Sequence, residues 1–99
     1  MLQIDRVVHE PARLMIMMAL AGVEWAEFPS LCGRLDLTRG NLSAHISRLE
    51  RRGYIQVKKG IIGKTPHTQY HLTKIGRAAL EHYWNSMDKI RRLGEVSAP

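Results

Sequence analysis

Residues 37–54 of the chain are Leu-Thr-Arg-Gly-Asn-Leu-Ser-Ala-His-Ile-Ser-Arg-Leu-Glu-Arg-Arg-Gly-Tyr. Within this stretch Leu42, Ile46 and Leu49 recur at steps of four and three. Because an α-helix turns once every 3.6 residues, the three side chains share one apolar stripe. The stretch therefore predicts a helix over residues 39–52 that packs on the rest of the domain through this stripe.

Both ends of this helix are marked, and its second face has an unusual composition. Thr38 stands where an N-cap hydroxyl accepts hydrogen bonds from first-turn amides, and Gly53 can supply the positive φ that ends a helix. The face opposite the stripe has short side chains, two arginines and no carboxylate: Gly40, Ser43, Ala44, Ser47, Arg48 and Arg51. Small and basic residues can approach a polyanion closely, and an α-helix fits the major groove of B-DNA. We therefore interpret this element as a recognition helix.

The positive charge of the chain is concentrated around the same helix. The 99 residues include 15 Lys and Arg against 9 Asp and Glu, for a formal net charge of +6. Residues 39–77 hold nine of the basic residues and a single acid, Glu50, for a net charge of +8, so the remainder carries −2. This concentration is typical of a nucleic-acid binder, whereas a generally basic surface predicts a uniform distribution.

Length and composition limit the other possibilities. Ninety-nine residues form one domain with room for a core, and 44% hydrophobic with 24% charged residues is ordinary for a globular chain. The longest apolar run, residues 14–21, is too short to cross a bilayer, and residues 1–6 lack a signal-peptide pattern. The chain has a single cysteine, Cys32, which favours a cytoplasmic location and no disulfide framework.

The segment before the recognition helix predicts two further helices. Pro11 suits the first position of a helix that ends near Gly22. Because the run inside it is apolar nearly all round, this helix is expected to lie deep in the core or to pack on two sides. Residues 23–28 allow a short strand. Residues 30–35 then predict a short helix, and its tight turn into the recognition helix completes a helix-turn-helix pattern.

Beyond the recognition helix the pattern becomes that of paired strands. Residues 54–59 and 68–72 alternate between apolar and polar side chains, and the residues between them are rich in turn formers. The sequence therefore predicts a β-hairpin with a long basic tip. Ile61 and Ile62 in this tip are unusual for exposed positions, and they either pack back on the domain or lie against a sugar-phosphate chain.

Thr73 is the expected N-cap of a last helix over residues 74–93. Four apolar residues step along it by three, four and three, as in a seam for a partner helix: Leu80, Tyr83, Met87 and Ile90. A helix of this length cannot be buried along its whole length by so small a domain. We therefore expect its distal half to pack on a second copy of the chain, and residues 94–99 to form a disordered tail.

At this point the chain resembles a known family, the small stand-alone winged-helix transcriptional regulators related to the MarR and ArsR groups. The resemblance is carried by residues 9–14, 37–45, 49–55, 63–66 and 72–77, in that order. It implies a mainly α winged helix-turn-helix with a small β-hairpin wing (α+β) in residues 1–93, including a dimerisation helix over 74–93. It also implies a homodimeric DNA-binding repressor or activator.

The resemblance further implies which residues contact double-stranded DNA. In the recognition helix, placed in the major groove, these are Arg39, Asn41, Ser43, Ala44, His45, Ser47 and Arg48. In the wing, residues 58–68 on the backbone or minor groove, they are Lys58, Lys59, Lys64, Thr65 and His67. There are two departures, since Ala44 stands where relatives often have lysine and the connection that contains Trp25 is longer. For His45, at the margin of the apolar stripe, a structural hydrogen bond and a DNA contact are both open.

Other classes of function lack a matching motif. No glycine-rich phosphate loop, nucleophile motif or paired carboxylates indicates an enzyme, and no cofactor is implied. His67 and His71 on one strand face would lie about 13 Å apart, so no metal site is expected. Two alternatives stay open: a winged helix for RNA or protein contact, and a regulator released by a small aromatic effector. Such an effector would bind a dimer cleft lined by Tyr83, Trp84 and methionines of the first helix.

Overall fold

The structure is a computed structural model that describes residues 2–95, and it has the element order of a winged helix. The elements are α1 (Pro11–Ala21), β1 (Ala26–Glu27), α2 (Phe28–Leu35), α3 (Arg39–Arg51), β2 (Ile55–Ile62), β3 (Thr65–Leu72) and α4 (Lys74–Arg92). Four helices and a three-stranded antiparallel sheet confirm the predicted α+β class. Of the predicted tail, residues 96–99 lie outside the described residues.

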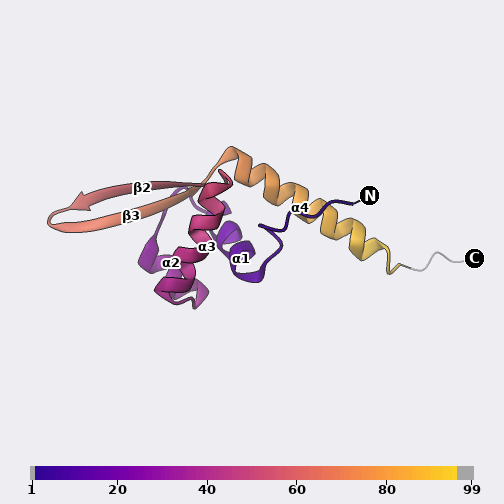
Figure 1. Cartoon of the computed structure of the whole chain (residues 1–99), viewed down its shortest axis with the longest axis horizontal. Helices are drawn as coiled ribbons and strands as arrows, with labels where there is room; N and C mark the ends of the chain where they lie inside the picture. Colours follow the sequence, from indigo (N-terminus) through magenta and orange to yellow (C-terminus); the bar gives the residue numbers. More distant parts are fainter. Residues whose placement is uncertain (1, 96–99) are drawn as a thin grey trace, which may run out of the picture.

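The molecule is elongated, with extents of 68 × 25 × 21 Å. Helices α1, α2 and α3 form a central body, from which the β2–β3 hairpin extends on one side and α4 on the other (Figure 1). The N-terminal segment runs back beside α4 (Figure 1). Both projections leave the body, so their outer parts have no core of their own to cover them.

The predicted caps and turns are confirmed. The hydroxyl of Thr38 accepts from the backbone N–H of Asn41, and that of Thr73 accepts from the N–H of Gly76. Gly53 has a φ of 77° after the end of α3. Asp36 has a φ of 53° between α2 and α3, a conformation that Asp tolerates better than most residues. These local signals set the ends of the helices.

The core is formed where α1, α3 and the first half of α4 meet the inner face of the sheet. Leu42, Ile46 and Leu49 are all buried, which confirms the predicted stripe of α3. In α1 only one face is buried, and Met15 and Met18 are exposed. Helix α1 therefore does not lie deep in the core but packs on several elements, among them α3 and strand β3, which is the second of the two expected arrangements.

The hairpin is more regular than the sequence indicated. Strand β3 lies between β1 and β2, and β2 pairs with β3 without interruption from Ile55↔Leu72 to Ile62↔Thr65. Only Gly63 and Lys64 remain in the turn, with Gly63 at a φ of 64°, as two-residue hairpin turns require. The predicted long tip was therefore wrong. An exposed hairpin has no buried face, so apolar alternation stops while backbone pairing continues.

Half of the predicted partner seam on α4 belongs to the chain's own core. Leu80 and Tyr83 are each 5% exposed, Met87 packs partly against the core, and Ile90 is exposed. Leu80 and Tyr83 are therefore unavailable to a second chain, and this part of the interface prediction was wrong. Periodicity shows that a face is apolar, but it does not show whether the covering surface comes from the same chain.

A glycine at the start of α4 provides a test of the packing. A Cβ at Gly76 would overlap the carbonyl oxygen of Tyr54 and lie 2.8 Å from Leu72 Cδ1. We expect Gly76→Ala to lower the free energy of unfolding by about 1–3 kcal/mol, since the backbone must move. At Gly33 in α2 nothing lies within 4 Å of such a Cβ. Gly33→Ala should instead raise stability by about 0.5–1 kcal/mol, and chemical denaturation of both variants measures the contrast.

Candidate nucleic-acid interface

The exposed face of α3 carries six of the seven predicted base-contacting residues. Arg39, Asn41, Ser43, Ala44, Ser47 and Arg48 are exposed. This follows from the buried stripe, because a helix that packs through Leu42, Ile46 and Leu49 must turn its other side outward. Glu50 is the single acidic residue within α3, β2 and β3, so the surface of these elements is strongly basic.

The seventh residue, His45, is half-buried and turned toward α1. Arg13 Nη1 donates a hydrogen bond to His45 Nδ1 (3.2 Å), and Glu10 Oε2 lies 3.7 Å from the same nitrogen. Of the two roles left open for His45, these contacts match the structural hydrogen bond. They also join the recognition helix to the first turn of α1.

Arg13, a residue with no role predicted from the sequence, is 7% exposed. Besides the contact with His45, its Nε donates to the carbonyl oxygen of Val7 (2.6 Å) and its Nη2 to that of Arg6 (3.4 Å). A buried guanidinium is tolerated because it has such acceptors. Arg13 thus fastens the N-terminal segment to both α1 and α3. Arg13 Nη1 also lies 3.9 Å from Glu10 Oε2, and both residues belong to the segment 9–14 that carries the family resemblance.

The first residue of α3 is oriented by an aromatic ring. The guanidinium carbon of Arg39 lies 4.9 Å from the centre of the Phe28 ring, and Phe28 packs on Tyr70 of β3. Phe28 was another residue that the sequence analysis missed. A cleft between the helices and the wing is lined by Phe28 and Arg39 on one side and by Thr65 and Pro66 on the other. The beginning of the recognition helix and the wing therefore border one cleft.

The wing exposes four of its five predicted contact residues: Lys58, Lys59, Lys64 and Thr65. His67 differs, because it is half-buried and its Nδ1 lies 3.4 Å from Glu27 Oε2. The carboxylate beside it offsets positive charge at that point of the wing. The basic surface of the wing is thus concentrated on its three lysines.

Trp25, in the longer connection noted above, fixes the base of the wing. Its ring centre lies 5.1 Å from that of His71 and 4.9 Å from Lys58 Nζ. His71 Nδ1 in turn donates to the carbonyl oxygen of Glu24 (2.6 Å). These contacts join the segment before β1 to both strands of the hairpin. The extra aromatic residue therefore holds the wing against the body.

The carboxylate of Asp5, in the N-terminal segment, binds residues that directly follow α3. Asp5 accepts hydrogen bonds from the Tyr54 hydroxyl and from the Val7 N–H (2.9 Å), and Arg52 Nη2 lies 3.7 Å from its Oδ2. Partial burial acts to raise the pKa of Asp5, but these hydrogen bonds and the Arg52 charge lower it below its ordinary value of 3.8. Burial and the Asp5 carboxylate raise the pKa of Tyr54. Arg52 is thus engaged internally.

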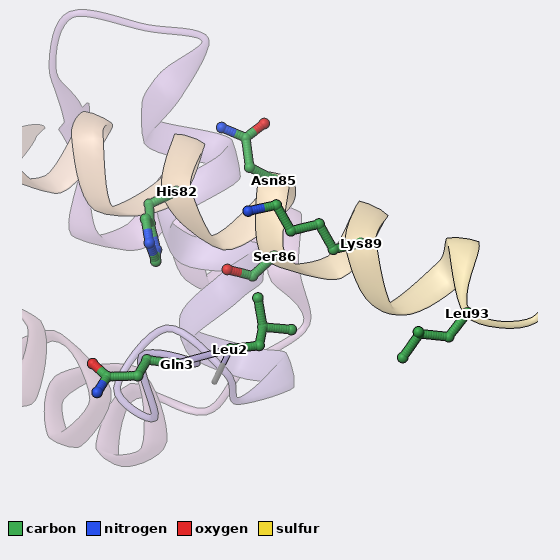
Figure 2. A pocket seen from close by; sticks show the side chains of 7 residues that line it. All are labelled: Leu2, Gln3, His82, Asn85, Ser86, Lys89 and Leu93. Atoms are coloured by element: carbon green, nitrogen blue, oxygen red, sulfur yellow. The ribbon is translucent and has the colours of Figure 1, made fainter.

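A second surface lies along the outer part of α4. An open groove is lined by Leu2 and Gln3 of the N-terminal segment on one side and, on α4, by His82, Asn85, Ser86, Lys89 and Leu93 (Figure 2). On the other flank of α4, Trp84 Nε1 donates to Met18 Sδ (3.4 Å). Of the residues suggested for an effector cleft, Met17 and Tyr83 are buried, and Met15, Met18 and Trp84 are exposed.

Two other types of site are absent from residues 2–95. No group of three or more His, Cys, Asp or Glu side chains in this range is placed to hold a metal ion. None of the helices described here combines the length and the hydropathy that a membrane span requires.

Comparison with known proteins identifies similar chains. A family model described as a winged helix DNA-binding domain matches residues 12–91. An uncharacterized protein of Methanocaldococcus jannaschii is 35% identical over 78 residues, which cover 79% of this chain and 85% of that protein. The structure of a transcriptional regulator homologue from Pyrococcus horikoshii OT3 is 30% identical with a TM-score of 0.84, covering 93% and 91% of the two chains. MarR, at 12% identity and a TM-score of 0.74 over 89% of this chain and 64% of its own, has the same fold.

The Asp5 contacts predict how stability depends on pH. Because the pKa of Asp5 is lower when folded, its ionised form stabilises the fold above about pH 4, and this contribution is lost as the pH falls through the folded pKa. We expect Asp5→Asn to lower the free energy of unfolding by about 1–2 kcal/mol at pH 7, with the difference shrinking at low pH. Asp88→Asn, at a half-exposed carboxylate of α4 whose partners Arg91 and Arg92 are both exposed, is the control and should have a smaller effect. A difference for Asp5 that grows on acidification would contradict this account.

Proposed function

This chain belongs to the winged helix DNA-binding domain family, and from this we propose that it is a homodimeric transcriptional regulator that binds double-stranded DNA sequence-specifically. In this proposal α3 lies in the major groove and the β2–β3 wing contacts the backbone or the minor groove. The observation that carries it is the cleft bordered by both Arg39 of α3 and the wing strand β3. Through it the basic recognition helix and the basic hairpin can meet one duplex together. The regulator homologue from Pyrococcus horikoshii supports the assignment to transcription.

Affinity and specificity would come from different residues. Lys59 and Lys64 on the wing would neutralise phosphates and release counterions, which binds DNA without reading its sequence. Arg48, which is exposed in the last turn of α3, can bond guanine in bidentate geometry, and Asn41 can do so with adenine. Ser43 and Ser47 have short side chains, which allow the helix backbone to approach the bases.

A second copy of the chain would double the length of DNA that is read. One recognition helix reads about 4–5 base pairs, too few to be found among competing genomic sites. The outer part of α4 extends beyond the body with Met87 partly covered and Ile90 exposed, and the groove of Figure 2 lies along the same part of the helix. We infer that this part of α4 and the N-terminal segment pack on a partner copy.

Binding-site selection from random duplexes tests the proposal. Two α3 helices related by a two-fold axis should select a pseudo-palindrome with half-site centres about 10 base pairs apart, or a multiple of that spacing. Footprinting of the selected duplex should show two protected half-sites. A single asymmetric half-site would contradict the dimer, and equal affinity for duplex RNA would favour the alternative of an RNA-binding module.

Substitutions at Arg48 and Lys64 should separate base reading from phosphate binding. We expect Arg48→Ala to relax the preference at one base pair of the half-site, at a cost of about 1–3 kcal/mol on the preferred sequence. Lys64→Ala should weaken binding to all sequences alike and reduce the slope of log K against log salt by about one. Lys74→Ala, which removes the same charge from the exposed start of α4, should leave this slope unchanged. Equal losses for Arg48→Ala on every duplex would show that Arg48 contacts phosphate only.

A further inference from the structure

The tip of the wing carries two isoleucines that no part of the described chain covers. Ile61 is 73% exposed and Ile62 is 63% exposed. The sequence allowed these side chains either to pack back on the domain or to lie against a sugar-phosphate chain, and the structure excludes the first. Because these two isoleucines lie at the end of a projecting hairpin, they contribute nothing to the core. A binding role would account for apolar side chains at these positions.

The strand register puts these two side chains on opposite faces of the hairpin. Ile61 is opposite Pro66, and Ile62 is opposite Thr65. Side chains alternate between faces along a strand, so Ile61 shares the inner face with buried Ile55, and Ile62 shares the outer face with Lys58. Gly63 and Lys64 alone form the turn that joins β2 to β3, directly after the two isoleucines. The tip is therefore only two strands wide and has one apolar side chain on each face.

Lysines flank this apolar tip. Lys59 precedes Ile61 by two residues on the inner face, Lys58 shares the outer face with Ile62, and Lys64 occupies the turn. Neither strand of the hairpin contains an acidic residue. An apolar edge surrounded by ammonium groups is complementary to the minor groove of a duplex, where apolar deoxyribose faces form the walls and phosphates line both rims.

We propose that the wing tip is an apolar wedge that enters the minor groove of duplex DNA, with Ile61 and Ile62 packed on the deoxyribose walls and Lys59 and Lys64 at the phosphates. Some proteins that bind the minor groove insert apolar side chains, isoleucine included, between base steps, so this groove accepts apolar residues. This inference rests on the proposed function and adds a contribution to affinity that is not electrostatic. It also places the tip in the groove, whereas the lysines alone would equally allow contact with the backbone only.

The size of the patch favours DNA over a protein partner. A stable protein interface buries roughly 800 Å² on each partner. A two-residue turn preceded by two isoleucines does not offer so large a surface. The cleft that joins Thr65 and Pro66 to Arg39 also connects the tip to the surface proposed to bind DNA. The apolar tip is therefore continuous with that surface.

The test compares apolar and charged changes at the tip across a range of salt concentrations, on a duplex chosen by selection. We expect the double variant Ile61→Ser, Ile62→Ser to bind about 10- to 100-fold more weakly at every salt concentration, with the slope of log K against log salt unchanged. Lys64→Ala should instead change that slope. Ile75→Ser is the matched control, because Ile75 is also 63% exposed but lies at the start of α4, and its affinity should equal that of the wild type.

A second measurement locates the contact in the minor groove. Replacing guanine by inosine in the base pairs next to each half-site removes the 2-amino group from the minor groove and leaves the major groove unaltered. We expect this replacement to strengthen binding of the wild type and to have no effect on the double serine variant. Thermal unfolding should show that both proteins are equally folded, since neither isoleucine is buried.

The outcomes separate this inference from the proposed function. If the wild type binds a selected duplex and the double serine variant binds it equally well, or with an altered salt slope, the wedge is overturned and the regulator stands. If the wild type binds no duplex at all, both proposals fail. A loss of affinity that is parallel at all salt concentrations, together with the lost response to inosine, supports the wedge.

Discussion

The packing of the apolar stripe of α3 against α1 and the sheet is the interaction on which the rest of the molecule depends. Leu42, Ile46 and Leu49 are buried together with Ile16, Met17 and Leu20 of α1. Burying these side chains provides the main driving force for placing the helix. It also sets the rotation of α3 about its axis, so the residues that face outward are determined by those that face inward. The candidate DNA-binding surface is a consequence of core packing.

Polar contacts add to the apolar packing that positions α3. Arg13 links two carbonyls of the N-terminal segment to His45 in the middle of α3, and Asp5 links the same segment to Tyr54 and Arg52 just after it. The segment that lies along α4 is thus fastened to the recognition helix at two points. Any contact of a partner copy with residues near Leu2 would therefore be made on a segment that directly touches α3.

The two projections of the fold differ in how they are supported. The wing continues a sheet whose base is held by Trp25 against His71 and Lys58, and its outer half is stabilised by backbone pairing and by the contact of His67 with Glu27. Helix α4 is anchored by Leu80 and Tyr83, beyond which it extends from the body with little cover. A small domain gains reach in both directions in this way. The exposed apolar residues at both ends, Ile61 and Ile62 on the wing and Ile90 on α4, are the side chains that the core cannot reach.

By itself the sequence determined the features that depend on near neighbours. Thr38, Gly53 and Thr73 mark helix ends because caps act within one turn, and the spacing of Leu42, Ile46 and Leu49 sets the buried face of α3. The resemblance carried by five short segments predicted the winged helix, and the matching family model confirms it.

Only the tertiary structure decided the features that depend on residues far apart in the chain. Whether Leu80 and Tyr83 face a partner or their own core, whether His45 meets Arg13, and whether Phe28 supports Arg39 all depend on how distant elements pack. The length of the wing strands could not be predicted from the sequence either, because backbone hydrogen bonds between strands need no particular side chain. Local periodicity records which faces are apolar, and three-dimensional packing selects what covers them.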